Sequence, residues 1–316
     1  MSQTLYLGID TSNYTTSLSV VDGDGQVLFN KKQLLPVKDG ACGLRQSDAL
    51  FAHTKALPAI FREAEPYLLK GDLKAVGVSA TPRAREGSYM PCFLAGVSVA
   101  EAVSVSAGIP LYTFSHQCGH LMAAIATSGA EKLLSGRPFL AFHLSGGTTE
   151  MLLCRFTENG FSSTIVGGTA DISAGQLIDR IGVEMGLSFP CGKEMEQLAL
   201  SYQGKFPKVK IASKDGFINL SGYQNKLCEV YAKTRDKAYV SAYTLYIIKE
   251  AVKTILQSHA DAATLPVLFS GGVMSCAYLQ REMNALCEGY FAPPAFSSDN
   301  AAGIAFLTRR KAQKGV

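Results

Sequence analysis

The chain has 316 residues, of which 47% are hydrophobic and 18% are charged, and its formal net charge is +4. This composition excludes a disordered chain, and the length predicts two lobes rather than one simple core. The mild positive charge permits a nucleic-acid partner without requiring one. No run of about 18 apolar residues occurs, so we expect no membrane-spanning helix. The eight cysteines form no CxxC pair and no signal peptide is seen, which predicts reduced thiols, no disulfide partner and a cytoplasmic protein.

The first segment predicts a strand, a polar turn and two further strands. Residues 5–10 read as a continuous apolar strand that ends in the carboxylate of Asp10, and strands at 16–21 and 26–30 follow it. This order is typical of an actin- or sugar-kinase-like nucleotide-binding lobe, in which turn amides face phosphates and an Asp orients a metal or water. An ordinary β-meander that carries an Asp in a turn explains these residues equally well.

The next segment alternates helices and strands. Residues 47–64 predict an amphipathic helix, residues 75–79 a buried strand, and residues from 93 onward a helix of small residues that packs closely on a sheet. Alternation of this kind predicts an α/β architecture.

Two histidines one helical turn apart follow the next predicted strand. The apolar run at 109–114 predicts that strand, and Ser115 is placed to cap the helix after it. Because residues i and i+4 share one face of a helix, His116 and His120 can converge on one ion. A third ligand must come from elsewhere in the chain. Asp299 is the candidate, although it could equally cap the last helix.

The second half of the chain repeats the opening pattern, which indicates an internal duplication. A strand at 138–144 ends in a glycine-containing turn, and such a turn lets backbone amides approach an anion closely; the alternative is a simple hairpin. A helix is expected to open at Asp171, with this residue as its cap. Residues 239–256 predict a long helix whose apolar residues recur at steps of three and four, as in a core helix. Another glycine turn ends the strand at 267–270 and feeds a helix, so an anion or a ribose could lie at that helix's N-terminus.

Seven motifs then occur in an order that is specific to one family. They are HxxxH at 116–120, SGGTTE at 145–150, ADISAGQLIDR at 170–180, FPCG at 189–192, NLSGYQ at 219–224, FSGGV at 269–273 and SDNAAGIA at 298–305. Over nearly the whole chain they resemble the TsaD group, the threonylcarbamoyltransferases of the tRNA N6-threonylcarbamoyladenosine pathway. The resemblance implies a two-lobed actin/sugar-kinase-like (ASKHA) α/β fold. It implies a lobe at 1–110, on which a C-terminal helix at about 299–316 packs, and a second lobe at 111–298 that carries most of the site.

The resemblance also assigns site residues. His116, His120 and Asp299 match the family's metal ligands, which usually hold iron or zinc, with magnesium as an alternative. The positions that match the nucleotide site are Ser145, Gly146, Gly147, Thr148 and Thr149 in the phosphate loop, Asp179 and Gly192 beside the adenosine, Gly271 and Gly272 in the second glycine turn, and Cys276. The ligand implied is threonylcarbamoyl-AMP, or ATP or ADP. The partners implied are tRNA and helper proteins similar to TsaB and TsaE.

Several residues depart from the family pattern and predict a divergent paralogue with an open choice of acceptor. They are Tyr14, Thr148, Ile172, Gln224 and Cys276.

The expected activity is the metal-dependent transfer of a threonylcarbamoyl group from threonylcarbamoyl-AMP to N6 of adenosine 37 in tRNA, or a paralogous carbamoyl-type transfer. Asp10 is the candidate for positioning water or transferring a proton. Gln117 stands where zinc proteases carry their catalytic Glu, which argues against a peptidase. Two alternatives stay open: a carbamoyl-transferring or kinase-like enzyme that acts on a small molecule, and a non-catalytic subunit of the modification complex.

Overall fold

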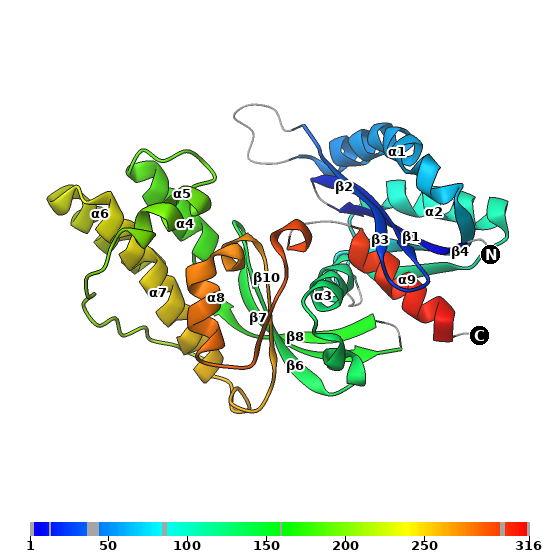
Figure 1. Cartoon of the computed structure of the whole chain (residues 1–316). Helices are drawn as coiled ribbons and strands as arrows, with labels where there is room; N and C mark the ends of the chain where they lie inside the picture. The colour runs from blue at the N-terminus through cyan, green and yellow to red at the C-terminus, as the bar shows by residue number, and fades with distance from the viewer. Residues whose placement is uncertain are drawn as a thin grey trace. The chain divides into compact units, whose positions relative to one another are not determined.

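The computed structural model describes residues 3–12, 14–36, 44–83, 87–158, 160–297 and 301–314. The chain forms two compact units (Figure 1). Unit 1 comprises Met1–Glu131, Phe156–Ser162 and Ser298–Val316, and unit 2 comprises Lys132–Arg155 and Ser163–Ser297. Each unit is built around a sheet with helices packed on it, which confirms the predicted α/β fold with two sheet-and-helix halves.

Unit 1 holds a five-stranded sheet in the order β3-β2-β1-β4-β5. The strands are β1 (Gln3–Ser12), β2 (Thr15–Asp22), β3 (Val27–Leu34), β4 (Gly71–Thr81) and β5 (Leu111–Ser115). The central strand β1 pairs antiparallel with β2 and parallel with β4. Most of β1 is buried, which is the reason for its continuous apolar sequence.

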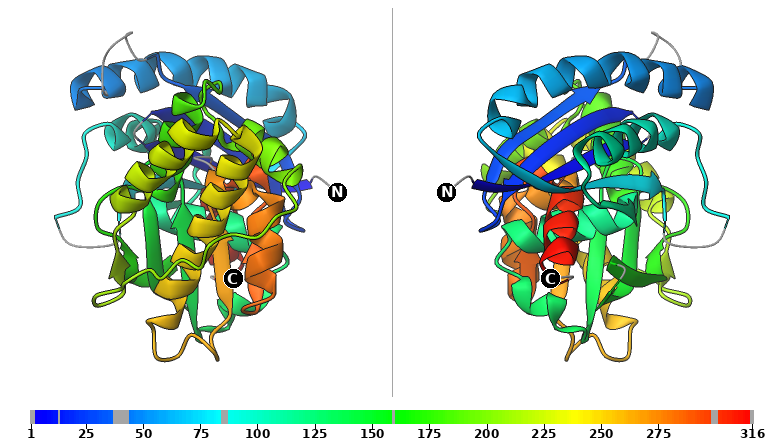
Figure 2. Two further views of the ribbon diagram at one scale, coloured as in Figure 1. Left: turned by 90° about the vertical axis from the view of Figure 1, so that its left-hand side faces the viewer. Right: turned by 90° about the vertical axis from the view of Figure 1, so that its right-hand side faces the viewer.

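Helices cover both faces of this sheet, and the residues of β1 alternate between them. Leu7 and Ile9 pack in one core with α1 (Gln46–Leu68) and α2 (Phe93–Ala107). Figure 2 shows α1 lying over the strands of this sheet. Gly8 faces the other helix layer, where a Cβ on it would lie 2.4 Å from the backbone nitrogen of Ala305. That layer is α9 (Ala302–Lys314), which packs on β1, β4 and α3 (His116–Thr127).

Unit 2 holds a six-stranded sheet in the order β11-β10-β6-β7-β8-β9. The strands are β6 (Pro138–Leu144), β7 (Thr149–Thr157), β8 (Gly160–Thr169), β9 (Phe217–Ile218), β10 (Val267–Ser270) and β11 (Gly289–Phe291). The helices are α4 (Ala174–Glu184), α5 (Gly192–Leu200), α6 (Ser221–Thr234), α7 (Lys237–Gln257) and α8 (Ala277–Asn284). Short 3₁₀ helices occur at Glu131–Ser135, Gly272–Ser275 and Pro294–Phe296.

The core of unit 2 lies between this sheet and α7. Leu140, Phe142 and Phe269 from β6 and β10 pack with Tyr243 and Ile247 of α7. The apolar residues of α7 recur at steps of three and four, so the sequence predicts this buried helix correctly.

Two further predictions concern composition. None of the cysteines in the described ranges forms a disulfide. Among the described residues, no helix has both the length and the apolar character needed to cross a membrane.

Candidate metal and nucleotide sites

In unit 1, the end of β1 presents a buried carboxylate to the first turn of α3. The side chain of Asp10 is 1% exposed. Its Oδ1 accepts a hydrogen bond from the backbone N–H of Ser12 at 2.9 Å, and its Oδ2 lies 2.8 Å from Nδ1 of His116. Because both oxygens meet protein groups, this carboxylate is held in one orientation.

The two histidines of α3 then point their remaining nitrogens at each other. Ser115 caps the helix, as predicted, and its hydroxyl accepts a hydrogen bond from Cys118 N. Nε2 of His116 lies 2.8 Å from Nε2 of His120, and the two rings stand at 77°. A carboxylate that accepts from Nδ1–H leaves the lone pair on Nε2 of His116, which is the tautomer that binds metals.

This arrangement fits a divalent metal as two of its ligands. Neighbouring nitrogen ligands of a tetrahedral zinc ion, each about 2.0–2.1 Å from it, lie about 3.3 Å apart, so small rotations of the rings suffice. Imidazole nitrogens suit zinc and iron. Asp299 lies outside the described residues. Within the ranges that the structure describes, no group of three or more His, Cys, Asp or Glu side chains could by itself hold an ion. Metal binding by His116, His120 and Asp299 therefore stays a prediction.

In unit 2, hydrogen bonds between its own first and last residues hold the turn after β6, and the two glycines between them are exposed. The backbone N–H of Ser145 donates to the carbonyl of Thr148 at 2.8 Å. The N–H of Thr148 donates to the Ser145 hydroxyl at 3.2 Å. Gly146 and Gly147 are exposed, and a Cβ on either would meet nothing within 4 Å. Their backbone is therefore accessible to a ligand.

The N-terminus of α4 is fixed against this turn. Ser173 caps α4 in a capping box with Gln176, and its hydroxyl also donates to the carbonyl of Gly146 at 2.9 Å. The N–H of Ala174 donates to the buried hydroxyl of Thr149 at 2.8 Å. A Cβ on Gly175 would lie 2.4 Å from the carbonyl oxygen of Ser145. The positive end of α4 therefore lies beside the exposed glycines, which favours an anion there.

The predicted cap of α4 is wrong. Asp171 accepts hydrogen bonds from the N–H groups of Ile172, Leu220 and Ser221 instead, and so ties the start of α6 to the segment before α4. Ser173 takes the capping role because it directly precedes the first helical residue and has Gln three positions later.

Two further turns belong to the same region of unit 2. Gly271 has φ +94°, and a Cβ on it would lie 2.1 Å from the carbonyl oxygen of Leu144, so this position requires glycine. The following segment Gly272–Ser275 contacts both β6 and α4. Oδ1 of Asp179 accepts a hydrogen bond from Cys191 N at 2.9 Å and thereby holds the turn before α5, whose first residue is Gly192.

Cys276 directly precedes α8, and its thiol is neutral. Burial, as the main cause, raises the pKa of its thiol to about 12, and the negative charge of Glu196 adds to the rise. A thiol with this pKa is protonated at neutral pH and is no nucleophile. Among the other departures from the family pattern, Ile172 packs in the core of unit 2, and Gln224 accepts a hydrogen bond from Arg180 at 3.0 Å.

The fold resembles that of nucleotide-binding proteins of known structure. Full-length HypF, in a phosphate- and nucleotide-bound form, matches with a TM-score of 0.57 and 13% identity over 98% of this chain and 46% of that one, so this chain spans slightly less than half of HypF. The activator of 2-hydroxyisocaproyl-CoA dehydratase from Clostridium difficile matches with a TM-score of 0.54 and 12% identity over 98% and 96% of the two chains. A glucokinase of the ROK family from Streptomyces griseus matches with a TM-score of 0.51 and 13% identity over 97% and 99%. These likenesses confirm the predicted ASKHA-type fold and, at such low identity, show the fold alone.

Sequence comparison carries the assignment further. A protein from Thermus thermophilus named tRNA N6-adenosine threonylcarbamoyltransferase is 29% identical over 314 residues, which cover 98% of this chain and 93% of that one. A protein of the same name from Streptococcus suis is 29% identical over 323 residues, which cover 96% and 91%. The family model TsaD, described as tRNA N6-adenosine threonylcarbamoyltransferase, matches residues 47–306, and the chain therefore belongs to the TsaD family.

Proposed function

We propose that this chain transfers a threonylcarbamoyl group from threonylcarbamoyl-AMP to the N6 amine of an adenosine in tRNA, with the help of a divalent metal. The observation that carries this proposal is the linked set Asp10, His116 and His120, found in a member of a family whose relatives are named for this transfer. A scaffold protein would need no imidazole pair oriented by a buried carboxylate.

The proposed metal ligands His116 and His120 lie in unit 1. His116 and His120 would hold the ion through their Nε2 atoms, and we propose Asp299 as a third ligand. Iron or zinc suits this donor set. Once bound, the ion would supply a Lewis acid for the carbamoyl carbonyl. Asp10 acts behind His116: by accepting a hydrogen bond from Nδ1–H it orients the ring and raises the basicity of Nε2.

The proposed nucleotide site lies in unit 2. The exposed amides of Gly146 and Gly147 and the N-terminus of α4 would bind the adenylate phosphate, and the segments at Gly192 and Gly271 would flank the rest of the nucleotide. As the amine attacks, a C–N bond forms while the C–O bond to phosphate breaks; AMP leaves with the electron pair of that bond, and the proton that the amine loses passes to water. Amides that are already fixed on that phosphate stabilise this charge without reorganisation.

The name of the family relatives supports a tRNA acceptor. We propose tRNA as the macromolecular substrate, helper proteins similar to TsaB and TsaE as partners, and the cytoplasm as the place of action. The departures from the family pattern, Thr148 among them, favour a second candidate: the same transfer to the amine of a small molecule.

The test is a nucleoside analysis. Purified protein, loaded with iron or zinc, is incubated with threonylcarbamoyl-AMP and tRNA that lacks the modification, and the digested tRNA is analysed by mass spectrometry. We expect threonylcarbamoyladenosine with the native chain and none with His116→Ala. Release of AMP without modified nucleoside, with and without TsaB- and TsaE-like partners, would contradict the tRNA proposal and favour the small-molecule acceptor.

A further inference from the structure

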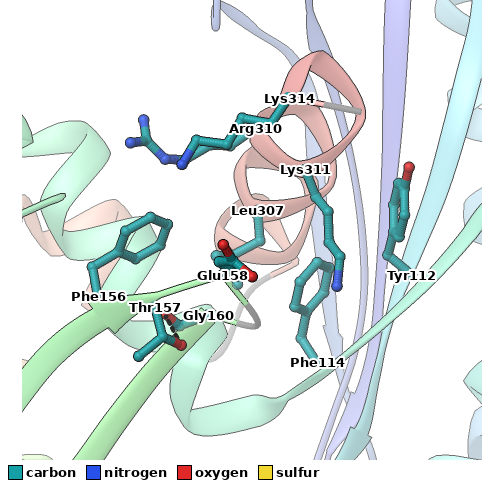
Figure 3. A pocket seen from close by; sticks show the side chains of 10 residues that line it. All are labelled: Tyr112, Phe114, Phe156, Thr157, Glu158, Gly160, Leu307, Arg310, Lys311 and Lys314. Atoms are coloured by element: carbon teal, nitrogen blue, oxygen red, sulfur yellow. Dashed lines mark hydrogen bonds between the residues drawn. The ribbon is translucent and has the colours of Figure 1, made fainter. Parts of the chain in front are cut away.

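Unit 1 contains a pocket of about 540 Å³ that the proposed reaction does not use. Three elements line it: β5, the tip between β7 and β8, and the C-terminal half of α9. The lining residues are Tyr112, Phe114, Phe156, Thr157, Glu158, Gly160, Leu307, Arg310, Lys311 and Lys314. Figure 3 shows Phe156 on one side, with the side chain of Arg310 reaching toward it, and Tyr112 and Phe114 on the other side, with Lys311 beside them.

The wall formed by the β7–β8 tip is firmly built. The backbone N–H of Phe161 donates to Sγ of Cys118 in α3 at 3.4 Å, and the same thiol donates to the carbonyl of Phe161 at 3.7 Å. The ring of Phe161 meets that of Phe156 edge to face, with centroids 5.1 Å apart. The hydroxyl of Thr157 donates to the carbonyl of Gly160 at 3.2 Å. These contacts hold Phe156 in place as one side of the pocket.

The cations of the pocket lie on aromatic rings. The guanidinium of Arg310 lies 4.8 Å from the ring centroid of Phe156, and Nζ of Lys314 lies 5.8 Å from the same centroid. Nζ of Lys311 lies 5.6 Å from the centroid of Tyr112. The pocket therefore presents flat aromatic rings and positive charges side by side.

One hydrogen-bond donor of Arg310 is unsatisfied within the described part of the chain. Its Nε atom is buried and finds no hydrogen-bond partner among the described residues. The adjacent Arg309, in contrast, donates to the carbonyl of Gly23 at 2.8 Å. Burial is the main cause that lowers the pKa of Arg310, and the charge of Arg309 lowers it further. Glu158 is the one carboxylate among the ten lining residues, against three cations. An anion would complete the site.

We propose that this pocket binds one unstacked nucleotide, with its base against the Phe156–Arg310 face and its phosphate on the basic groups of α9. The buried side chains of Phe114 and Leu307 form an apolar floor, and the volume falls in the range of about 300–1,000 Å³ that small-molecule sites occupy. Stacking on aromatic and guanidinium planes beside basic groups is the usual way in which proteins bind single-stranded bases. The nucleotide could come from an RNA or be a free nucleoside monophosphate. The choice of RNA as the source rests on the proposed function, whereas the chemistry of the pocket does not.

The test uses the full chain and two probes, a fluorescein-labelled oligouridine of about eight nucleotides and UMP. The double variant Arg310→Ala/Lys314→Ala should bind the oligouridine about tenfold more weakly, and the slope of log affinity against log salt should fall by about 1.4, as expected for two lost contacts to a single strand. Phe156→Leu should weaken binding about tenfold with an unchanged salt slope, and Phe156→Tyr should restore it.

The matched control is Lys55→Ala/Lys70→Ala. These exposed lysines of unit 1 lie over Phe51 and Tyr67 at 5.4 and 5.6 Å but line no part of this pocket, so their loss should leave the affinity unchanged. Competition by UMP that disappears in the pocket variants would identify a free mononucleotide as the ligand. Binding of the oligouridine alone would identify RNA.

Equal affinity of the native chain and all pocket variants for both probes would overturn the proposal. The same titration with His116→Ala separates the two proposals. That variant should lose tRNA modification while it keeps the pocket's affinity for RNA, so failure of the reaction and failure of the pocket give different results.

Discussion

At the scale of single residues, the orientation of His116 depends on Asp10. The carboxylate accepts a hydrogen bond from Nδ1–H at 2.8 Å and another from the backbone N–H of Ser12. Asp10→Asn keeps the shape but can present an amide donor to Nδ1, which favours the wrong tautomer. We expect affinity for zinc to fall about 10- to 100-fold, as is usual when the hydrogen-bond partner of a metal-binding histidine is lost. Titration with zinc, followed by calorimetry, measures this.

A second carboxylate of unit 1 supplies the control for this variant. Asp22 accepts hydrogen bonds from the N–H groups of Asp24 and Gln26 in a turn that is not part of the histidine pair. Asp22→Asn should therefore leave zinc affinity as it is. If Asp10→Asn binds zinc as tightly as the native chain, Asp10 does not orient His116 in the way proposed.

The sequence predicts the histidine pair but not its partner. The spacing of His116 and His120 follows from helix geometry, and both lie on the same side of α3. Asp10 is 106 residues away from His116. The two meet because β4 pairs with both β1 and β5, which brings the end of β1 near the start of α3. No local pattern encodes that strand order.

At the scale of elements, the close approach of α4 to the phosphate turn depends on Gly175. The clashing groups of a Cβ there would be backbone atoms, the carbonyl of Ser145 at 2.4 Å and Cα of Gly146 at 2.6 Å, which cannot rotate away. Gly175→Ala should therefore lower the free energy of unfolding by about 1–3 kcal/mol and weaken ADP binding. Urea unfolding and a fluorescence titration measure the two effects.

Gly222 in α6 is the matched glycine, because a Cβ on it would meet nothing within 4 Å. Gly222→Ala should be neutral or stabilise the chain by up to about 1 kcal/mol, since alanine favours the helix. A Gly175→Ala variant that behaves like this control would show that α4 does not need such close contact with the turn.

The hydrogen bonds between Asp171 and the start of α6 make the stability of unit 2 depend on pH, and the direction of this dependence can be predicted. Burial acts to raise the pKa of Asp171, but hydrogen bonds from Ser221, Leu220 and Ile172 outweigh it, and the pKa lies below its ordinary value. A lowered carboxyl pKa stabilises the fold above the unfolded-state value of about 3.9, and this contribution is lost as the pH falls through the folded-state value.

Asp171→Asn should therefore destabilise unit 2 at pH 7 and lose this effect in acid. The side chain is exposed to water, so we expect a difference of no more than about 1 kcal/mol. Urea unfolding of both proteins between pH 7 and pH 3 measures it. If the difference in the free energy of unfolding between the two proteins stays constant or widens as the pH falls, these hydrogen bonds do not have the role assigned to them.

Elements whose apolar residues recur with a clear period are predicted well from the sequence. Hydrogen bonds between elements that are far apart in the chain are not. The apolar steps of α7 and the Ser115 cap of α3 are local features, so both predictions are correct. An Asp before a helix usually caps it, which is why the sequence indicates Asp171 for α4. The actual partners of Asp171, Leu220 and Ser221, follow about fifty residues later and become visible only in the folded chain.

At the scale of the whole molecule, the repeated strand–turn–strand pattern predicts two similar halves. It does not predict which half each segment of the chain belongs to. Residues Phe156–Ser162 belong to unit 1, although the strands on either side belong mainly to unit 2. One contact that ties them there is between Phe161 and the Cys118 thiol, a pair of residues with no sequence signature. The nucleotide pocket of unit 1 depends on this tie and could not be predicted from the sequence for the same reason.

Two units with separate cores should bind their ligands separately. The histidine pair lies in unit 1, and the glycine turns and α4 lie in unit 2. We therefore expect His116→Ala/His120→Ala to lose zinc but to bind AMP within about twofold of the native affinity, since substitutions without shared contacts are nearly additive. Gly175→Ala should keep its affinity for zinc but bind AMP more weakly.

Saturation with AMP at about 100 times its Kd should raise the free energy of unfolding of the histidine double variant by about 2.7 kcal/mol, as for the native chain. Thermal unfolding with and without AMP, alongside zinc analysis of each variant, measures both halves. Loss of AMP binding in the histidine variant would mean that the histidine pair is required for nucleotide binding, and the assignment of the phosphate to the turn at Ser145 alone would then be wrong.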